Sequence, residues 1–482
     1  MSTVDPTVGP GGLTVEANGI NVVAEAERKG VPRDLFWPWC AANISVLGIG
    51  YGAYLLGFGI SFWQALVAGL VGIVASFLLV GLVATSGMHA SAPTMIVSRA
   101  AFGVRGNALP AAVSYLVLVG WEIVLCALAT LATATVFGRL GWGSGTLTKI
   151  VAFLVVTAVI MLAGVVGFDL IMKLQTWLTV ALAILTVGYV ALTFHKVSWS
   201  AVSSLPAGST KAFVGAMVFA VSGFGLGWVN SGGDYSRYLP RTASRGGIIG
   251  WTTFGASLAP VVLVFYGLLL AGSDPELNKA IYSDPIGALT TVLPTWYLVP
   301  FALVAIGGLI GGAVLDIYSS GLNLLSLGLP VKRWQAASVD GVLMILGTIY
   351  VVWVADSFFF PFQGFLITLG VPMAAWCGVF LADLWRRRGS YDETSFYDAS
   401  ASYGAVGVPA VVTMLAGSVV GWGLVTNTYA DWLKWQGYLL GPLGLGGREG
   451  DWAFANLGVL LALVVGFAGY LLVPDRSRQA KA

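Results

Sequence analysis

The chain has 482 residues, of which 57% are hydrophobic and only 10% are charged, whereas a typical soluble domain carries about 25% charged residues. Most of its surface therefore cannot face water, and we predict an all-α integral membrane protein. The net charge of +2 is too small to favour nucleic acid as a partner. The three cysteines and two histidines lie far apart in the sequence, so neither a metal cluster nor the nucleophile and base of an enzyme is expected.

About twelve apolar stretches are long enough to be transmembrane helices, since a spanning helix needs about 20 mostly apolar residues. They begin near Leu35, Phe62, Asn107, Lys149, Met172, Ala212, Ile248, Pro300, Ala336, Phe360, Ala405 and Ala453. Residues 35–194 and 195–385 would each hold five of these helices, and residues 386–473 would hold two more. Residues 1–34 and 474–482 are predicted to be tails outside the membrane.

The distribution of basic residues predicts the orientation, because Lys and Arg are retained on the cytoplasmic side of a membrane. With the N-terminus inside, most of the 24 Lys and Arg residues fall in the tails and in the loops on the cytoplasmic side. We therefore expect a multi-pass protein of the cell membrane with both termini cytoplasmic. The lipid bilayer is its expected surrounding, and the chain is expected to be a monomer.

Two carboxylates fall inside predicted spans, Glu122 in the third and Asp316 in the eighth. A carboxylate at the centre of a bilayer costs on the order of 3 kcal/mol, and such residues are usually functional. Both lie on polar stripes at helical spacing. Hydrogen bonds between helices are the alternative explanation of these stripes.

Glycine predicts where two helices are interrupted. Residues 45–50 of the first span and 222–227 of the sixth share the spacing Ser-x-x-Gly-x-Gly, and glycine weakens a helix by about 1 kcal/mol relative to alanine. Broken helices at corresponding positions of two halves indicate the binding site of a transporter. Because each half has an odd number of crossings, the two would form an inverted repeat. Residues 418–423 have the same spacing, and there we expect only close helix packing.

Four short motifs make the chain resemble the nucleobase–cation symporters of the purine–cytosine permease and hydantoin transporter type. They occupy residues 98–107, 120–121, 234–238 and 316–320. The resemblance implies a leucine-transporter-like fold, with a five-helix inverted repeat and two C-terminal helices. It also implies symport of a planar nucleobase or similar heterocycle by alternating access. Transport of a vitamin, ureide or amino acid is the alternative, and a channel is less favoured because no repeated filter loop is present.

The resemblance also implies the substrate contacts. Trp121 and Phe224 would stack on the two faces of the heterocycle. Asp316, at a position where relatives commonly have Asn, would accept hydrogen bonds from paired N–H donors on its edge. Leu125 stands where relatives often carry an amide, so that contact is lost. The predicted substrate-binding set also includes Gly225, Ser320, Gln363 and Ser45, although Gln363 could instead cap a helix.

The coupling ion is predicted to be a proton, with sodium as the alternative, and no cofactor or metal is expected. In sodium-coupled relatives the ion lies between carbonyls of the broken first span and hydroxyls of the eighth. Here residues 307–313 read Gly-Gly-Leu-Ile-Gly-Gly-Ala and offer no hydroxyl. A proton needs only a titratable group, and Glu122 is the predicted carrier. Asp316 and Gly48 complete the predicted coupling residues.

Overall fold

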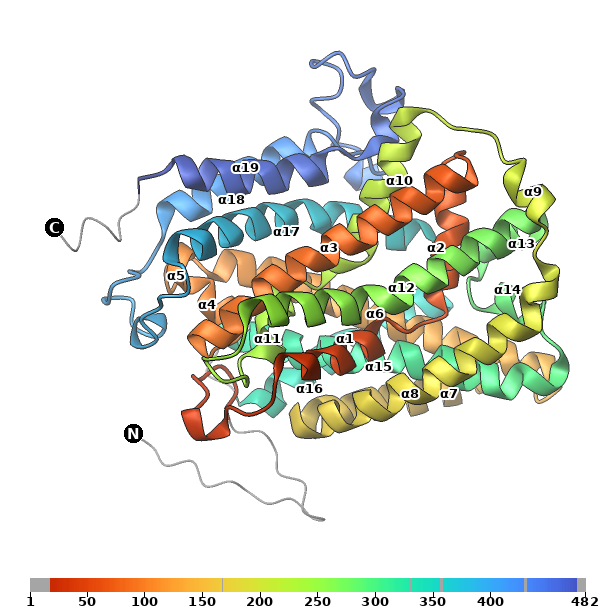
Figure 1. Cartoon of the computed structure of the whole chain (residues 1–482), viewed down its shortest axis with the longest axis horizontal. Coiled ribbons are helices and arrows are strands. Elements are labelled where there is room, and N and C mark those ends of the chain that lie inside the picture. The colour runs from red at the N-terminus through yellow and green to blue at the C-terminus, as the bar shows by residue number, and fades with distance from the viewer. Residues whose placement is uncertain (1–17, 167, 329–331, 356–358, 429–430, 475–482) are drawn as a thin grey trace.

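The computed structural model describes residues 18–166, 168–328, 332–355, 359–428 and 431–474. Within these ranges all regular structure is helical, and the long helices lie side by side along one axis of the molecule (Figure 1). Most of the predicted C-terminal tail, over 475–482, and residues 1–17 of the predicted N-terminal tail lie outside the described residues.

The described part of the chain contains eight helical segments long and apolar enough to cross a membrane, and one bent pair adds a ninth. Three shorter apolar helices bring the total to the expected twelve. In chain order after the bent pair, the spans are α3 (Phe62–Ala90), α6 (Ala108–Arg139), α7 (Thr146–Val166), α8 (Phe168–Thr193), α10 (Thr210–Gly223) with α11 (Gly232–Ser236), α12 (Arg245–Ser273), α15 (Leu298–Ser326), α16 (Arg333–Trp353), α17 (Phe359–Arg387), α18 (Val408–Trp422) and α19 (Gly458–Leu472).

The first span is the bent pair, in which α1 (Phe36–Asn43) and α2 (Leu47–Leu56) meet at 67°. The break covers residues 44–46 and so precedes the glycines that were expected to cause it. Gly48 and Gly50 lie inside α2, and a Cβ on Gly48 would lie 2.9 Å from Cβ of Leu263 in α12. The next glycine of α2, Gly52, approaches α12 more closely still, because a Cβ there would lie 2.4 Å from the carbonyl carbon of Gly267. The glycine spacing of this span therefore serves close helix packing.

In the sixth span the break coincides with the glycines, as predicted. Helix α10 ends at Gly223, and Phe224 leaves the helical conformation with φ −116° and ψ −105°. Short 3-10 turns then lead to α11. A Cβ on Gly225 would lie 2.3 Å from the carbonyl carbon of Ser76 in α3. Glycine is thus required here for the backbone of the break to pack against α3.

The two termini of the described chain lie at the same end of the molecule, as an even number of crossings requires (Figure 1). The opposite end carries the short helices α9 (Trp199–Ser203), α13 (Pro275–Ser283) and α14 (Gly287–Thr290). Two buried arginines close the end that holds the termini. Arg99 donates to the carbonyls of Ser326 and Phe396, each at 2.9 Å. Arg237 donates to the carbonyl of Gly19 at 2.7 Å. These arginines belong to two of the motifs noted in the sequence, which therefore stabilise the fold at this end.

Candidate functional site

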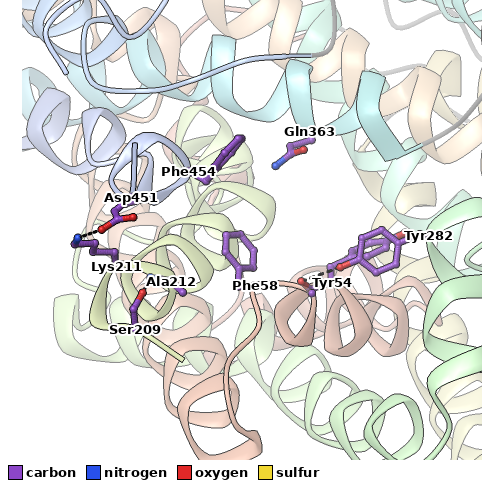
Figure 2. Close-up of a pocket in the computed structure, with 11 residues that line it drawn as sticks. Tyr54, Phe58, Ser209, Lys211, Ala212, Tyr282, Gln363, Asp451 and Phe454 are labelled. Atoms are coloured by element: carbon purple, nitrogen blue, oxygen red, sulfur yellow. Dashed lines mark hydrogen bonds and ion pairs between the residues drawn. The ribbon is translucent and has the colours of Figure 1, made fainter. Parts of the chain in front are cut away.

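A cavity of about 440 Å³ opens at the end of the molecule opposite the termini. Its walls come from the end of α2, the start of α10, the end of α13, α17 and the loop between α18 and α19. Figure 2 shows Phe58, Phe454 and Gln363 around its open centre, and an ion pair between Lys211 and Asp451 at one side. Gln363, a predicted substrate contact, is thus placed where a solute can reach it.

An aromatic cluster lies beside this cavity at the level of the two helix breaks. Phe362, the neighbour of Gln363, has its ring centroid 5.4 Å from that of Trp121 and 6.3 Å from that of Tyr51. The ring of Tyr51 lies 4.4 Å from that of Phe224, and its hydroxyl donates to the carbonyl of Gly223 at 3.1 Å. The cluster therefore brings both predicted stacking residues together with rings from the first and tenth spans.

The space beside Trp121 is closed in this structure. A void of only about 10 Å³ lies between Trp121, Leu226 and Phe365, and this is smaller than a heterocycle. A Cβ on Gly227 would lie 2.5 Å from Trp121 Nε1, so the indole lies directly on the unwound segment. Among the described residues, the rings of Trp121 and Phe224 are not in direct contact with each other. Phe362 and Phe365 on α17 both contact the indole of Trp121, with ring centroids 5.4 Å and 6.1 Å away.

Asp316 is a buried carboxyl without a partner in the described part of the molecule. Its side chain lies in α15 with 1% of the residue exposed, and neither oxygen has a hydrogen-bond partner there. Ion pairs between described residues do not include it. The hydroxyl of nearby Tyr235 donates to the Leu315 carbonyl at 2.9 Å. An unsatisfied carboxyl at this depth is available for a proton or a ligand.

Glu122 lies in a hydrogen-bonded group that the sequence predicted only in part. Ser320 Oγ lies 2.6 Å from Glu122 Oε1 and 3.0 Å from Asp340 Oδ2. All three residues are fully buried, on α6, α15 and α16. The hydroxyl of Ser320, a predicted substrate contact, is therefore occupied by two carboxyls. Asp340 was not selected from the sequence, because the residue lies near the start of its helix, where carboxylates are common. The available signal was its position four residues inside the span predicted to begin at Ala336.

Glycines of α15 face the break in the first span. A Cβ on Gly308 would lie 2.5 Å from the carbonyl oxygen of Ile44 and 3.1 Å from Cα of Ser45. A Cβ on Gly311 would lie 3.3 Å from the carbonyl oxygen of Ala41. Glycine has no side-chain oxygen. Gly308 and Gly311 therefore supply no cation ligand beside the backbone carbonyls of the break.

The structure places the two remaining predicted residues of the first span as follows. Ser45 is half-buried within the break, and its hydroxyl accepts a hydrogen bond from the backbone N–H of Leu47 at 3.3 Å. Gly48 packs against α12, where a Cβ would lie 2.9 Å from Cβ of Leu263. The contact of Gly48 is therefore with a neighbouring helix, and its predicted coupling role stays a prediction.

Broken first and sixth spans in opposite orientations, with an aromatic cluster between them, define a secondary transporter of the inverted-repeat class. The family described as permease for cytosine/purines, uracil, thiamine, allantoin matches residues 22–441. The chain belongs to this family. As a permease it is a transporter and not an enzyme, as the sequence predicted.

Two curated relatives agree with this assignment. YxlA of Bacillus subtilis, assigned as a purine-cytosine permease, is 24% identical over 413 residues, which cover 82% of this chain and 84% of the relative. The purine-cytosine permease FCY2 of Saccharomyces cerevisiae is 22% identical over 491 residues, with 95% of this chain and 87% of the relative covered.

Solved structures show the same fold. The nucleobase-cation-symport-1 family transporter Mhp1, closed with bromovinylhydantoin bound, superposes with a TM-score of 0.69 over 94% of this chain and 95% of its own, at 18% identity. A Na⁺-coupled sialic acid symporter superposes with a TM-score of 0.60 over 94% of this chain and 92% of its own, at 12% identity. The predicted all-α membrane fold and the predicted family are both confirmed.

Proposed function

We propose that this protein imports a planar nucleobase or closely related heterocycle by proton symport. The observation that carries the proposal is the aromatic cluster at the two helix breaks, beside a cavity that opens at one end of the molecule. The family description and the names of the curated relatives support this class of substrate. The termini would be cytoplasmic, so the cavity would face the outside of the cell membrane.

The chemistry of the cluster suits a flat, uncharged base. Aromatic side chains replace the water lost from its faces, and Trp121 and Phe224 would supply them. The polar edge needs hydrogen-bond partners, which Gln363 and the unpartnered carboxyl of Asp316 would provide. Backbone groups at Gly225 and at the break beside Ser45 would complete the substrate-binding site.

Alternating access would require α17 to move, because its rings close the space beside Trp121. The cavity would be the entrance, and Phe362 and Phe365 would separate it from the stacking residues. Substrate would then bind as α17 moves away, and closure of α17 over it would precede opening at the end that holds the termini.

The glycines of α15 favour a proton over sodium. Sodium is a hard cation that needs several oxygen ligands in place of its water. In this chain α15 presents Gly308 and Gly311 to the carbonyls of the broken first span, and neither offers an oxygen. Glu122 and Asp316 are buried carboxyls that can each take up a proton instead.

Radiolabelled uptake into proteoliposomes tests the proposal. Uptake of a nucleobase should be concentrative under an inward proton gradient and should persist without sodium. Glu122→Gln should lose the gradient dependence while exchange of substrate across the membrane survives, since exchange needs no net proton movement. Strict sodium dependence with pH-insensitive uptake would contradict proton coupling, and gradient-independent passive flux would indicate a channel.

The substrate class can be tested by thermal stability. A ligand that binds only the folded state raises the apparent stability by mass action. We expect stabilisation by one or more nucleobases in a screen that also contains ureides, vitamins and amino acids. Stabilisation by a member of another class alone would overturn the assignment of the substrate.

A further inference from the structure

Glu122 and Asp340 approach the same serine hydroxyl from two different helices. The distances to Ser320 Oγ are 2.6 Å from Glu122 Oε1 and 3.0 Å from Asp340 Oδ2. We infer that Glu122, Ser320 and Asp340 form one proton-binding site in which the two carboxyls share a proton through the serine. This inference rests on the proposed proton coupling and adds a second carboxyl and a relay to it.

The hydrogen-bonding capacity of Ser320 indicates that this group holds a carboxyl proton. A hydroxyl donates one hydrogen and accepts through its lone pairs, whereas an ionised carboxylate only accepts. Ser320 can therefore donate to one of its two carboxyl neighbours but not to both. The second contact is a hydrogen bond only if that carboxyl is protonated and donates to Ser320 Oγ. The geometry thus fits a state with at least one carboxyl proton.

The surroundings offer no counter-charge among the described residues. Ion pairs in that part of the chain include neither Glu122 nor Asp340. Two ionised carboxylates this close together in a low-dielectric interior would repel each other strongly. A shared proton removes that repulsion without a basic residue.

An independent polar group also points to this site. The side chain of Tyr115, which is 9% exposed, interacts with the Asp340 carboxyl. The other titratable groups near the site are Cys126 on α6 and Asp316 on α15. Helix α7 packs against α6, α15 and α16, and its titratable residue Lys149 lies at its far end, near Asp284. The Tyr115 hydroxyl thus provides a further donor for an ionised Asp340.

The same atoms can relay the proton. Protonated Asp340 transfers its proton to Ser320 Oγ while Ser320 passes its own hydrogen to Glu122 Oε1. The O–H bond of Asp340 breaks, that of Glu122 forms, and the serine hydroxyl is restored. Asp340 ends as the carboxylate and Glu122 as the acid, so charge and protons balance. Glu122 is the neighbour of Trp121 in the sequence, which would place the relayed proton close to the proposed substrate site.

Proton-driven uptake in proteoliposomes tests the second carboxyl. Asp340→Asn keeps the size of the side chain but removes its charge. Glu122 would then bind its proton without the like charge of Asp340, so the pH midpoint of gradient-driven uptake should move to lower pH by about one unit or more. Ser320→Ala should slow gradient-driven uptake several-fold. Ser319→Ala is the matched control, because its hydroxyl contacts Tyr235 instead of these carboxyls, and it should leave the midpoint unchanged.

Infrared spectroscopy of the purified protein supplies a readout that does not need transport. The wild type should show the carbonyl band of a buried protonated carboxyl, and both Glu122→Gln and Asp340→Asn should shift or remove it. If only Glu122→Gln changes the band and Asp340→Asn leaves the midpoint as in the wild type, Glu122 holds its proton alone and the shared site is wrong. If Glu122→Gln retains gradient-driven uptake, Glu122 is not the proton carrier, and that part of the proposed function is wrong.

Discussion

At the scale of single residues, the proposed functional centre contains buried polar groups that the fold leaves unsatisfied. A buried polar group without a hydrogen bond is costly, so such groups are few in folded proteins. Here both oxygens of Asp316 and one oxygen each of Glu122 and Asp340 lack partners among the described residues. Their placement on three helices that pack against one another fits the proposed roles in binding substrate and protons.

Trp121→Ala should weaken substrate binding about tenfold or more, because stacking on an aromatic ring contributes about 1–3 kcal/mol per base. Binding of radiolabelled substrate to purified protein measures this. Trp177→Ala is a matched control, since that indole is 78% exposed on α8, and its affinity should equal that of the wild type. An unchanged affinity in folded Trp121→Ala protein would remove Trp121 from the site.

Asp316→Asn should change the order of affinities among substrates more than the fraction of the protein that can bind substrate. An amide replaces one acceptor by a donor, so ligands with two adjacent N–H donors should lose about tenfold in affinity or more. Competition against one radiolabelled substrate by a panel of bases gives the ranking. A ranking identical to that of the wild type would argue against direct contact.

At the scale of elements, glycine permits close contacts that a side chain would prevent. Helix α15 approaches the break in the first span at Gly308, and α2 approaches α12 at Gly52 and Gly267. In a membrane, where helices gain little from excluding water, such small residues let backbones pack directly. The glycine that lets α15 approach the broken helix at Gly308 also leaves no side-chain oxygen at that position.

Gly308→Ala should lower the thermal stability of the purified protein. The new Cβ would lie 2.5 Å from the carbonyl oxygen of Ile44, and overpacking of this kind costs about 1–3 kcal/mol. Gly250→Ala in α12 is the control, because a Cβ there meets nothing within 4 Å, and its melting temperature should be equal or slightly higher. Equal melting temperatures for both variants would show that α15 and the break are not in tight contact.

At the scale of the whole molecule, the structure is open at one end, where the cavity lies, and closed at the other, where the buried arginines lie. The cavity of about 440 Å³ lies opposite the termini, whereas Arg99 and Arg237 bind backbone carbonyls across the other end. Transport by alternating access requires the molecule to exchange this state for one open at the end with the termini.

Thiol labelling can follow that exchange. Ala212→Cys places a thiol in the cavity, while Cys40, Cys126 and Cys377 are buried and free, so background labelling should be low. A membrane-impermeant reagent added on the cavity side should label the variant several-fold more slowly with saturating substrate and a proton gradient, as the population shifts away from this state. Ser200→Cys in exposed α9 should be labelled at a constant rate. Equal rates for Ala212→Cys with and without substrate would contradict alternating access through this cavity.

The membrane environment, the twelve spans and the family could be predicted from the amino-acid sequence alone, because long apolar runs and short motifs are local properties of the chain. The sequence also located the break of the sixth span and the buried carboxyls Glu122 and Asp316. Only the tertiary structure showed that the glycines of the first span serve packing, since their contacts with α12 come from residues more than 200 positions away. The group of Glu122, Ser320 and Asp340 was likewise decided by the packing of α6, α15 and α16. A hydrogen bond between helices depends on distances that no spacing along one helix can define.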